Sequence, residues 1–236
     1  MRATKGPAGN SRALTTPNGK EFKMKIVVFG ARGAVGSRIV AEARARGHNV
    51  TAVVRSSTQL NGEAQTVKSV AADITDATAL PSLLAGFDLA ISAVRPPDGQ
   101  EQDLATLTES LLTAAATAKI CLLIVGGAAS LLVPDKNLHT VLTAPGFLPD
   151  EVVPIARASF AQYELCREER HADWTYLSPP AMLVPGERKG HYRIGADTLL
   201  IDGDGNSHIS MEDFSVAMLD EAERPSHRQA RFTVAY

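Results

Sequence analysis

Short apolar runs alternate with helically spaced apolar residues along most of the chain. Runs of this length, rich in β-branched residues, predict buried strands, while apolar residues three and four apart predict helices. Strand followed by helix followed by strand is the pattern of an α/β protein with a doubly wound, mostly parallel sheet. The predicted strands are 26–29, 50–54, 87–93, 120–125 and 174–177, and the predicted helices are 35–46, 106–119 and 155–171.

The alternation stops near residue 180. Two short strands are predicted at 192–194 and 198–201, followed by a turn at 202–205. Ser210, with Asp213 three residues later, predicts the start of another helix, because a serine hydroxyl can accept the N–H group of the third residue that follows. After a terminal strand at 232–235, these pieces predict a small substrate-side lobe, residues 181–236, over the carboxyl ends of the sheet.

One long connection interrupts the pattern. Residues 131–154 contain four prolines and a glycine and show no periodicity. Irregular loops of this length in compact domains are usually functional. We therefore expect this loop to be a lid beside the bound ligand.

Composition narrows the class of protein. The 236 residues are 44% hydrophobic and 21% charged, with a net charge of −2, which favours a globular domain and argues against a broad nucleic-acid interface. No apolar run approaches the roughly 20 residues of a membrane span. Residues 1–23 lack apolar periodicity and predict a flexible tail, so that one domain covers 24–236. We expect a cytoplasmic protein, a monomer or homodimer, whose two cysteines are reduced.

A glycine turn after the first strand carries the strongest functional signal. Gly30, Gly33 and Gly36 stand between an apolar strand and a helix, and a second strand follows. In such a unit the first glycine permits a tight turn, the second lets the backbone approach phosphates, and the third lets the helix pack close to the strand. The helix then offers the N–H groups of Ala34 and Val35 and a positive dipole end to an anion. The sequence predicts a site for the pyrophosphate of a dinucleotide.

The end of the second strand indicates which dinucleotide. NAD-binding proteins usually carry Asp or Glu there, to accept hydrogen bonds from the ribose. This chain has Arg55 and Ser56, and Arg32 lies within the glycine turn. Guanidinium and hydroxyl groups suit a 2′-phosphate. We therefore predict NADP as the cofactor, with NADPH preferred over NADH, although Arg55 alone is also compatible with a solvated turn.

The glycine spacing, G-x-x-G-x-x-G, and several later segments resemble the atypical short-chain dehydrogenase/reductase group. Within it the chain is most similar to the NAD(P)H-binding, NmrA-like branch that includes biliverdin reductase B-like and NADH-flavin reductase-like proteins. The resemblance covers 24–236 and implies that Asp73 and Ile74 flank the adenine, and that Ala93, Val94 and Pro180 lie beside the nicotinamide half of the cofactor. The segments that carry it are 72–76, 91–94, 125–130, 174–181, 185–188 and 232–234.

One motif of ordinary short-chain dehydrogenases is incomplete. Their Tyr-x-x-x-Lys supplies a tyrosine proton donor and a lysine that lowers its pKa. Here Tyr163 is followed four residues later by Arg167, whose planar fork differs from an ammonium group. Tyr163 is thus either a catalytic acid or a residue that packs on the same helix face as Phe160.

The resemblance implies a reaction that needs little acid catalysis. It is direct hydride transfer to an electron-poor, flat acceptor such as a flavin or quinone, in which the protein mainly orients two rings. Ser130, at the position of the family's strand-five serine, is a candidate to hydrogen-bond the acceptor or the carboxamide, or else caps a turn.

Two alternatives stay open beside this reductase. One is an NmrA-like dinucleotide sensor without turnover, and the other is a biosynthetic isomerase or epimerase that uses Tyr163 as its acid and base.

Metal binding is not expected. Asp202, Asp204 and Asn206 have the spacing of a calcium loop, but Ser207 replaces the required glycine and the preceding segment is a predicted strand. A hairpin turn explains these residues better. The histidines show no helical ligand pair, so the expected partner is a small-molecule acceptor alone.

Overall fold

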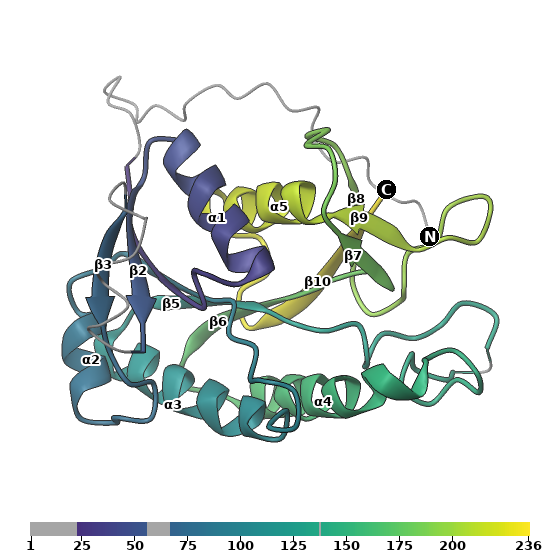
Figure 1. Ribbon diagram of the computed structural model, residues 1–236, viewed down its shortest axis with the longest axis horizontal. Helices are drawn as coiled ribbons and strands as arrows, with labels where there is room; N and C mark the ends of the chain where they lie inside the picture. The colour runs from purple at the N-terminus through teal and green to yellow at the C-terminus, as the bar shows by residue number, and fades with distance from the viewer. Residues whose placement is uncertain (1–22, 56–66, 137) are drawn as a thin grey trace.

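The computed structural model describes residues 23–55, 67–136 and 138–236 (Figure 1). Residues 1–22 and Ser56 lie outside this part, so the predictions made for the tail and for Ser56 have no structural counterpart here. The strands are β1 (Lys25–Phe29), β2 (Asn49–Val54), β3 (Lys68–Ala71), β4 (Leu89–Ser92), β5 (Cys121–Val125), β6 (Asp173–Ser178), β7 (Met182–Val184), β8 (Arg193–Gly195), β9 (His208–Ser210) and β10 (Ala230–Ala235). The helices are α1 (Ala34–Ala45), α2 (Ala79–Leu84), α3 (Asp103–Ala118), α4 (Val153–Glu168) and α5 (Met211–Glu223), with a 3-10 turn η2 (Asp150–Val152) before α4.

The described residues form an eight-stranded sheet with helices on both faces, which confirms the predicted doubly wound α/β fold. The strand order is β3-β2-β1-β4-β5-β6-β10-β8, and all pairs are parallel except β10 with β8. Strand order reverses between β1 and β4. In open parallel sheets this reversal leaves a crevice at the carboxyl ends of the strands, where ligands bind.

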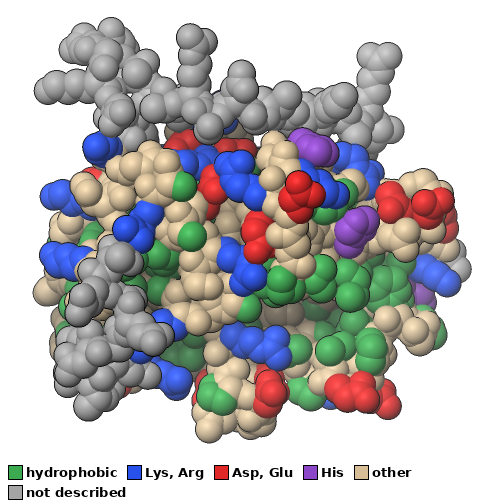
Figure 2. All heavy atoms as spheres, turned by 45° about the horizontal axis from the view of Figure 1, so that its top comes forward, with side chains coloured by type: hydrophobic (Ala, Val, Ile, Leu, Met, Phe, Trp, Pro, Cys, Tyr) green, Lys and Arg blue, Asp and Glu red, His purple; other side chains and the backbone are tan. Residues whose placement is uncertain are grey.

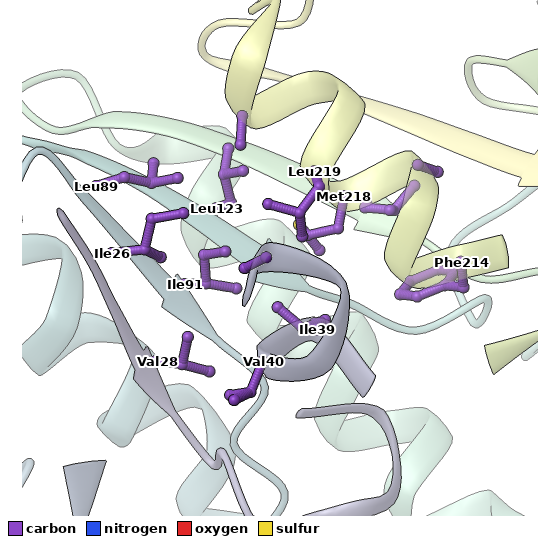
Figure 3. Packing of buried hydrophobic residues seen from close by; sticks show 14 of the residues in the cluster. Ile26, Val28, Ile39, Val40, Leu89, Ile91, Leu123, Phe214, Met218 and Leu219 are labelled. Carbon is purple, nitrogen blue, oxygen red and sulfur yellow. The ribbon is translucent and has the colours of Figure 1, made fainter. Parts of the chain in front are cut away.

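Alternating side chains of the strands divide the core into two layers. Ile26 and Val28 of β1 point to the face covered by α1 and α5, while Val27 and Phe29 point to the face of α2, α3 and α4 (Figure 1). Figure 3 shows the first layer, in which strand residues meet Ile39 of α1 and other apolar residues of the two helices. Each fully buried side chain of this size contributes about 1.5–3 kcal/mol, so both layers hold the helices firmly on the sheet.

In the C-terminal part, the strands lie at other residues than the sequence predicts. Residues 198–201 form no strand, and Thr198 makes only an isolated bridge to Leu132. Two strands that were not predicted, β7 and β9, pair in parallel as a separate small sheet. The helix α5 and the strand β10 return to the main body, so the part that stands off from the sheet is the segment between β6 and α5.

The start of α5 confirms the predicted cap. The Ser210 hydroxyl accepts a hydrogen bond from the Asp213 N–H at 3.0 Å. The Asp213 carboxylate is fully buried and accepts the N–H groups of Lys189 and Gly190 at 3.0 and 2.7 Å. The Asp213 side chain in the first turn of α5 therefore also fixes the turn that leads into β8.

The long connection after β5 is anchored to the rest of the structure. Leu131, Val133 and Val141 form a small hydrophobic cluster with Leu199. The Leu132 N–H donates to the Asp197 carbonyl and the Leu132 carbonyl accepts the Leu199 N–H, both at 2.8 Å. These contacts make the connection a wall attached to the C-terminal segment.

The predictions made for the cysteines and for membrane spans can also be compared with the structure. Neither cysteine is in a disulfide, and burial raises the pKa of the Cys166 thiol to about 12. Across the described ranges, no helix combines the length and the apolar character that a membrane span requires.

Candidate functional site

The glycine turn has the geometry that its sequence predicts. Gly30 adopts a φ of +72°, and a Cβ atom there would lie 2.2 Å from the Ala93 carbonyl oxygen at the end of β4. A Cβ atom on Gly36 would lie 2.1 Å from the Gly30 carbonyl oxygen. The third glycine therefore brings α1 against the turn itself, whereas the prediction placed this contact at the strand. Both positions exclude any side chain.

The first turn of α1 lacks the groups that usually satisfy a helix N-terminus. Gly33 is the N-cap residue and supplies no side-chain hydrogen bond, and the first turn contains no acidic residue. The N–H groups at this end and the positive end of the helix dipole are therefore available to an anion. This arrangement suits a phosphate group of a dinucleotide.

A cleft of about 520 Å³ lies directly at this turn. It is bordered by the carboxyl ends of β1, β2, β3 and β4, as expected for a topological switch point. Eight residues that the sequence singled out line it together: Gly30, Arg32, Gly33, Arg55, Asp73, Ile74, Ala93 and Val94.

The cleft also has a wall that the sequence did not reveal. It comes from the connection between β4 and α3, and its lining residues include Arg95, Pro96, Pro97 and Gln100. The tandem prolines after Val94 were the available signal, because they fix the backbone just where the strand ends.

The cleft carries both of the arginines on which the NADP prediction rests. Arg32 and Arg55 are exposed and line the cleft from the glycine turn and from the end of β2. The Asp73 carboxylate instead accepts the Thr75 N–H and hydroxyl, each at 2.8 Å, and these hydrogen bonds lower its pKa. The Arg55 guanidinium thus stands at the end of β2, where an NAD-binding protein would present a carboxylate, and Arg32 lines the same cleft from the glycine turn.

Tyr163 packs against the hydrophobic layer between the sheet and the helices α2, α3 and α4. Its ring centroid is 5.2 Å from that of Tyr176, and the Arg231 guanidinium lies over its face, 4.0 Å from the centroid. Burial raises the pKa of the Tyr163 phenol, and the smaller effect of Arg231 in the opposite direction does not offset it. These contacts are those of a packing residue, and they give no support to an easily formed phenolate.

Ser130 belongs to the same buried cluster. Its hydroxyl oxygen accepts a hydrogen bond from Arg231 Nη1 at 2.6 Å. Arg231 also binds the Asp197 carboxylate, through Nε at 3.2 Å and Nη2 at 2.5 Å. Sequence analysis did not identify Arg231, because an arginine within a terminal strand shows no sign of the distant residues it will join.

A second hydrogen-bonded chain fixes the end of β5. The Tyr176 hydroxyl is fully buried and accepts the Gly127 N–H at 3.0 Å. It lies 3.1 Å from Gln162 Oε1, and the Gln162 amide donates to the Thr108 hydroxyl at 2.9 Å. The loop after β5 is thereby tied to both α4 and α3.

Pro180 follows β6 and is buried. Ala181, the next residue, lines a second cavity of about 520 Å³. This cavity, called the lobe cavity below, lies between the anchored connection and the segment that stands off from the sheet. Hydrophobic side chains gather around a hollow on this face of the molecule (Figure 2). Its residues include Phe147, Ala181, Leu199 and His208.

The turn with calcium-loop spacing is closed by its own hydrogen bonds. The Asp202 N–H donates to the Asn206 carbonyl at 2.8 Å. Asp202 Oδ1 accepts the N–H groups of Asp204 and Asn206 at 2.9 and 2.8 Å. The aspartate thus acts as the residue that shapes the turn.

Comparison with known proteins agrees with this geometry. The sequence model of the NAD(P)H-binding family matches residues 30–222. The "Uncharacterized protein YwnB" of Bacillus subtilis (strain 168) is 36% identical over 213 residues, which are 89% of this chain and 98% of that protein.

Solved structures with similar folds have differing names. A "putative NADH-flavin reductase" from Streptococcus pneumoniae TIGR4 is 30% identical with a TM-score of 0.81, covering 90% of this chain and 99% of its own. A "putative epimerase" from Bacteroides thetaiotaomicron is 36% identical with a TM-score of 0.80, covering 90% and 96%. A "putative exported protein" from Burkholderia pseudomallei is 36% identical with a TM-score of 0.80, covering 90% and 100%.

Proposed function

Because the chain belongs to the NAD(P)H-binding family, we propose that it is an oxidoreductase that prefers NADPH and reduces a small, flat acceptor of the flavin or quinone type. The observation that carries the proposal is the first cleft, where an uncapped helix N-terminus, a glycine turn and two arginines meet. A dinucleotide with a 2′-phosphate matches each of these groups.

Different residues of the cleft bind different parts of the dinucleotide in this proposal. The turn at Gly30 and Gly33 brings main-chain N–H groups to the pyrophosphate, while Arg32 and Arg55 supply positive charge for the 2′-phosphate. Ala93 and Val94 offer an apolar surface farther along the cleft, toward β5 and β6. The bound nicotinamide supplies a hydride, and the protein orients the acceptor next to it.

The contacts of Tyr163 favour this reaction over an epimerase. Epimerisation through this residue requires a tyrosine that exchanges protons readily, yet burial raises the phenol pKa and Arg231 covers the ring face. Reduction of a flavin or quinone makes no such demand on Tyr163, because the accepting ring delocalises the incoming charge and can take its proton from another group or from water.

One experiment tests the proposal. The purified protein is titrated with NADPH and NADH, and then mixed with NADPH and a panel of riboflavin, FMN and quinones while nicotinamide absorbance is followed. We expect binding with NADPH favoured, and turnover with at least one acceptor. Binding without turnover would indicate a dinucleotide sensor instead, and failure to bind either nucleotide would refute both functions.

The proposal also places the protein in the cytoplasm, where NADPH is available to it. The name of the Burkholderia pseudomallei relative makes this worth testing directly. Fractionation of cells that produce the full chain is expected to recover it with cytoplasmic enzymes, and recovery outside the cytoplasmic membrane would refute this placement.

A further inference from the structure

The lobe cavity shares no lining residue with the cleft at the glycine turn, and it lies at the carboxyl end of β6. The sheet order sets β6 two strands beyond β4, where the cofactor cleft ends. A dinucleotide bound at the glycine turn and extended along this edge would point its nicotinamide half toward the lobe cavity. A volume of about 520 Å³ is within the range of small-molecule pockets, which is roughly 300–1,000 Å³.

The chemistry of its walls is mainly apolar. Val133 and Phe147 come from the anchored connection, and Leu199 and Ile201 come from the segment after β8. Met182 of β7 is exposed over 57% of its surface and completes the rim. Among the described residues that line this cavity none is lysine or arginine, so it offers no counter-ion to a phosphate.

The polar corner of the cavity is formed by Asn206, Ser207 and His208. His208 is the one titratable side chain that the described part of the chain contributes to the lining. Its ring meets the Tyr236 ring edge-on, with centroids 5.3 Å apart, and its carbonyl accepts the Tyr236 N–H at 3.0 Å. The contact with Tyr236 thus orients the imidazole ring at the polar corner of a mainly apolar cavity.

We infer that the lobe cavity is the acceptor site and that it selects an uncharged, flat carbonyl compound of the quinone class over a phosphate-bearing flavin. This inference rests on the proposed function. Transfer of a hydride to a quinone leaves one of its oxygens as an oxyanion. The His208 ring gives that oxygen a proton from a ring N–H, which yields the neutral hydroquinone, and the ring then regains a proton from water.

The first test measures binding without turnover. Menadione, an uncharged naphthoquinone, is titrated calorimetrically into protein saturated with NADP⁺. Ala181→Trp places a large ring in the cavity from an exposed position and is expected to weaken binding at least tenfold. Val184→Trp, an exposed position on β7 that does not line the cavity, is the matched control and is expected to bind like the original protein.

The second test concerns charge selectivity. Riboflavin is expected to have at least a tenfold higher kcat/KM than FMN, because only FMN carries a phosphate. Met182→Arg adds a cation to the rim and is expected to move this ratio toward FMN by tenfold or more. A wild-type enzyme that prefers FMN, or a ratio that Met182→Arg leaves unchanged, overturns the assignment.

The third test isolates the role of His208. His208→Gln is expected to lower kcat for menadione by about tenfold to a hundredfold, with KM nearly unchanged. N-methylacridinium accepts a hydride without any proton, so its kcat is expected to be the same in both proteins. Equal losses with both acceptors would overturn the proton-donor role.

The outcomes separate this inference from the proposed function. If the protein turns over acceptors but Ala181→Trp behaves like Val184→Trp, the lobe cavity is not the acceptor site although the reductase stands. If menadione binds and Ala181→Trp abolishes binding but no acceptor is reduced, the cavity is a ligand site and the reductase proposal is wrong. Absence of menadione binding in the wild-type protein overturns the inference outright.

Discussion

The guanidinium of Arg231 lies flat over the ring of Tyr163, 4.0 Å from its centroid. A contact of this kind contributes about 0.5–2 kcal/mol and needs the ring, not the hydroxyl group. We therefore predict that Tyr163→Phe retains kcat within about twofold of the original enzyme. Removal of a true acid or base would cost about a hundredfold or more, and steady-state kinetics with NADPH and a quinone separate the two results.

Arg55 is expected to distinguish the two cofactors. Arg55→Ala should raise KM for NADPH by about 5- to 150-fold, equivalent to about 1–3 kcal/mol, and leave KM for NADH nearly unchanged. Arg44→Ala removes the same charge from an exposed site of α1 that does not line the cleft, and both values should then stay the same. Equal losses with NADPH and NADH for Arg55→Ala would refute the contact with the 2′-phosphate.

The close packing of α1 on the glycine turn predicts a sharp effect of one methyl group. In Gly36→Ala the new Cβ would lie 2.1 Å from the Gly30 carbonyl oxygen, so the helix has to move away. We expect a loss of about 1–3 kcal/mol, with Tm lower by about 2–4 °C per kcal/mol, and weaker NADPH binding. Thermal unfolding and titration check both effects.

Gly203→Ala provides the comparison for that variant. Its Cβ would have no atom within 4 Å, so Tm and NADPH binding should remain those of the original protein. An equally stable Gly36→Ala would contradict the geometry of the turn.

An ion-pair network at the C-terminal end of α1 predicts acid sensitivity. Arg46 binds Glu42 and Asp220 at 2.8 Å and Glu223 at 2.9 Å, and it is mostly buried. Burial raises the pKa of the Glu42 and Glu223 carboxyls, but their hydrogen bonds and nearby positive charges outweigh it, so both pKa values are lowered. Since the unfolded chain binds these protons more readily, the stabilisation is present above about pH 4.3 and is lost as pH falls below it.

Arg46→Met should weaken this dependence together with part of the stability, while Arg188 still binds Glu42 and His48 still binds Glu223. We expect a loss of about 2–4 kcal/mol at pH 7 and a flatter stability profile between about pH 5 and pH 3. Urea unfolding at several pH values measures both. Arg224→Met, which removes an exposed arginine 4.0 Å from Asp220, should change little, and a similar loss in both variants would contradict the network.

Most strands of the main sheet are predicted from the sequence because they are apolar, but β3, with the residues Lys-Ser-Val-Ala and no fully buried side chain, is missed. Burial of the last four residues of β1 and full burial of β4 follow directly from the apolar character of their residues. The helix ends differ by a few residues: α3 begins at Asp103 and α4 ends at Glu168, because polar first and last turns do not contribute to an apolar stripe. The strands β7 and β9 have three residues each, too few to show a period, whereas β8 lies one residue after the predicted strand 192–194.

The part of the candidate site that comes from one contiguous segment was predictable from the sequence. The part that is assembled from distant segments was not. The glycine turn and Arg55 belong to one contiguous unit, and the structure brings them together. The lobe cavity joins Phe147, Ala181 and His208 from three separate segments, so no spacing along the chain could reveal it. Likewise, the partner of Ser130 is a residue 101 positions away.

The direction of β8 has a consequence for the whole C-terminal half. Since β8 runs opposite to β10, the chain travels back along the last strand, and Gly195 lies beside Thr233. That backward course delivers Asp197 to Arg231, whose other contacts are Ser130 and Tyr163. A strand in the opposite sense would carry this aspartate away from the arginine. The antiparallel direction of β8 at the edge of the sheet therefore places the Asp197 carboxylate beside the buried guanidinium of Arg231.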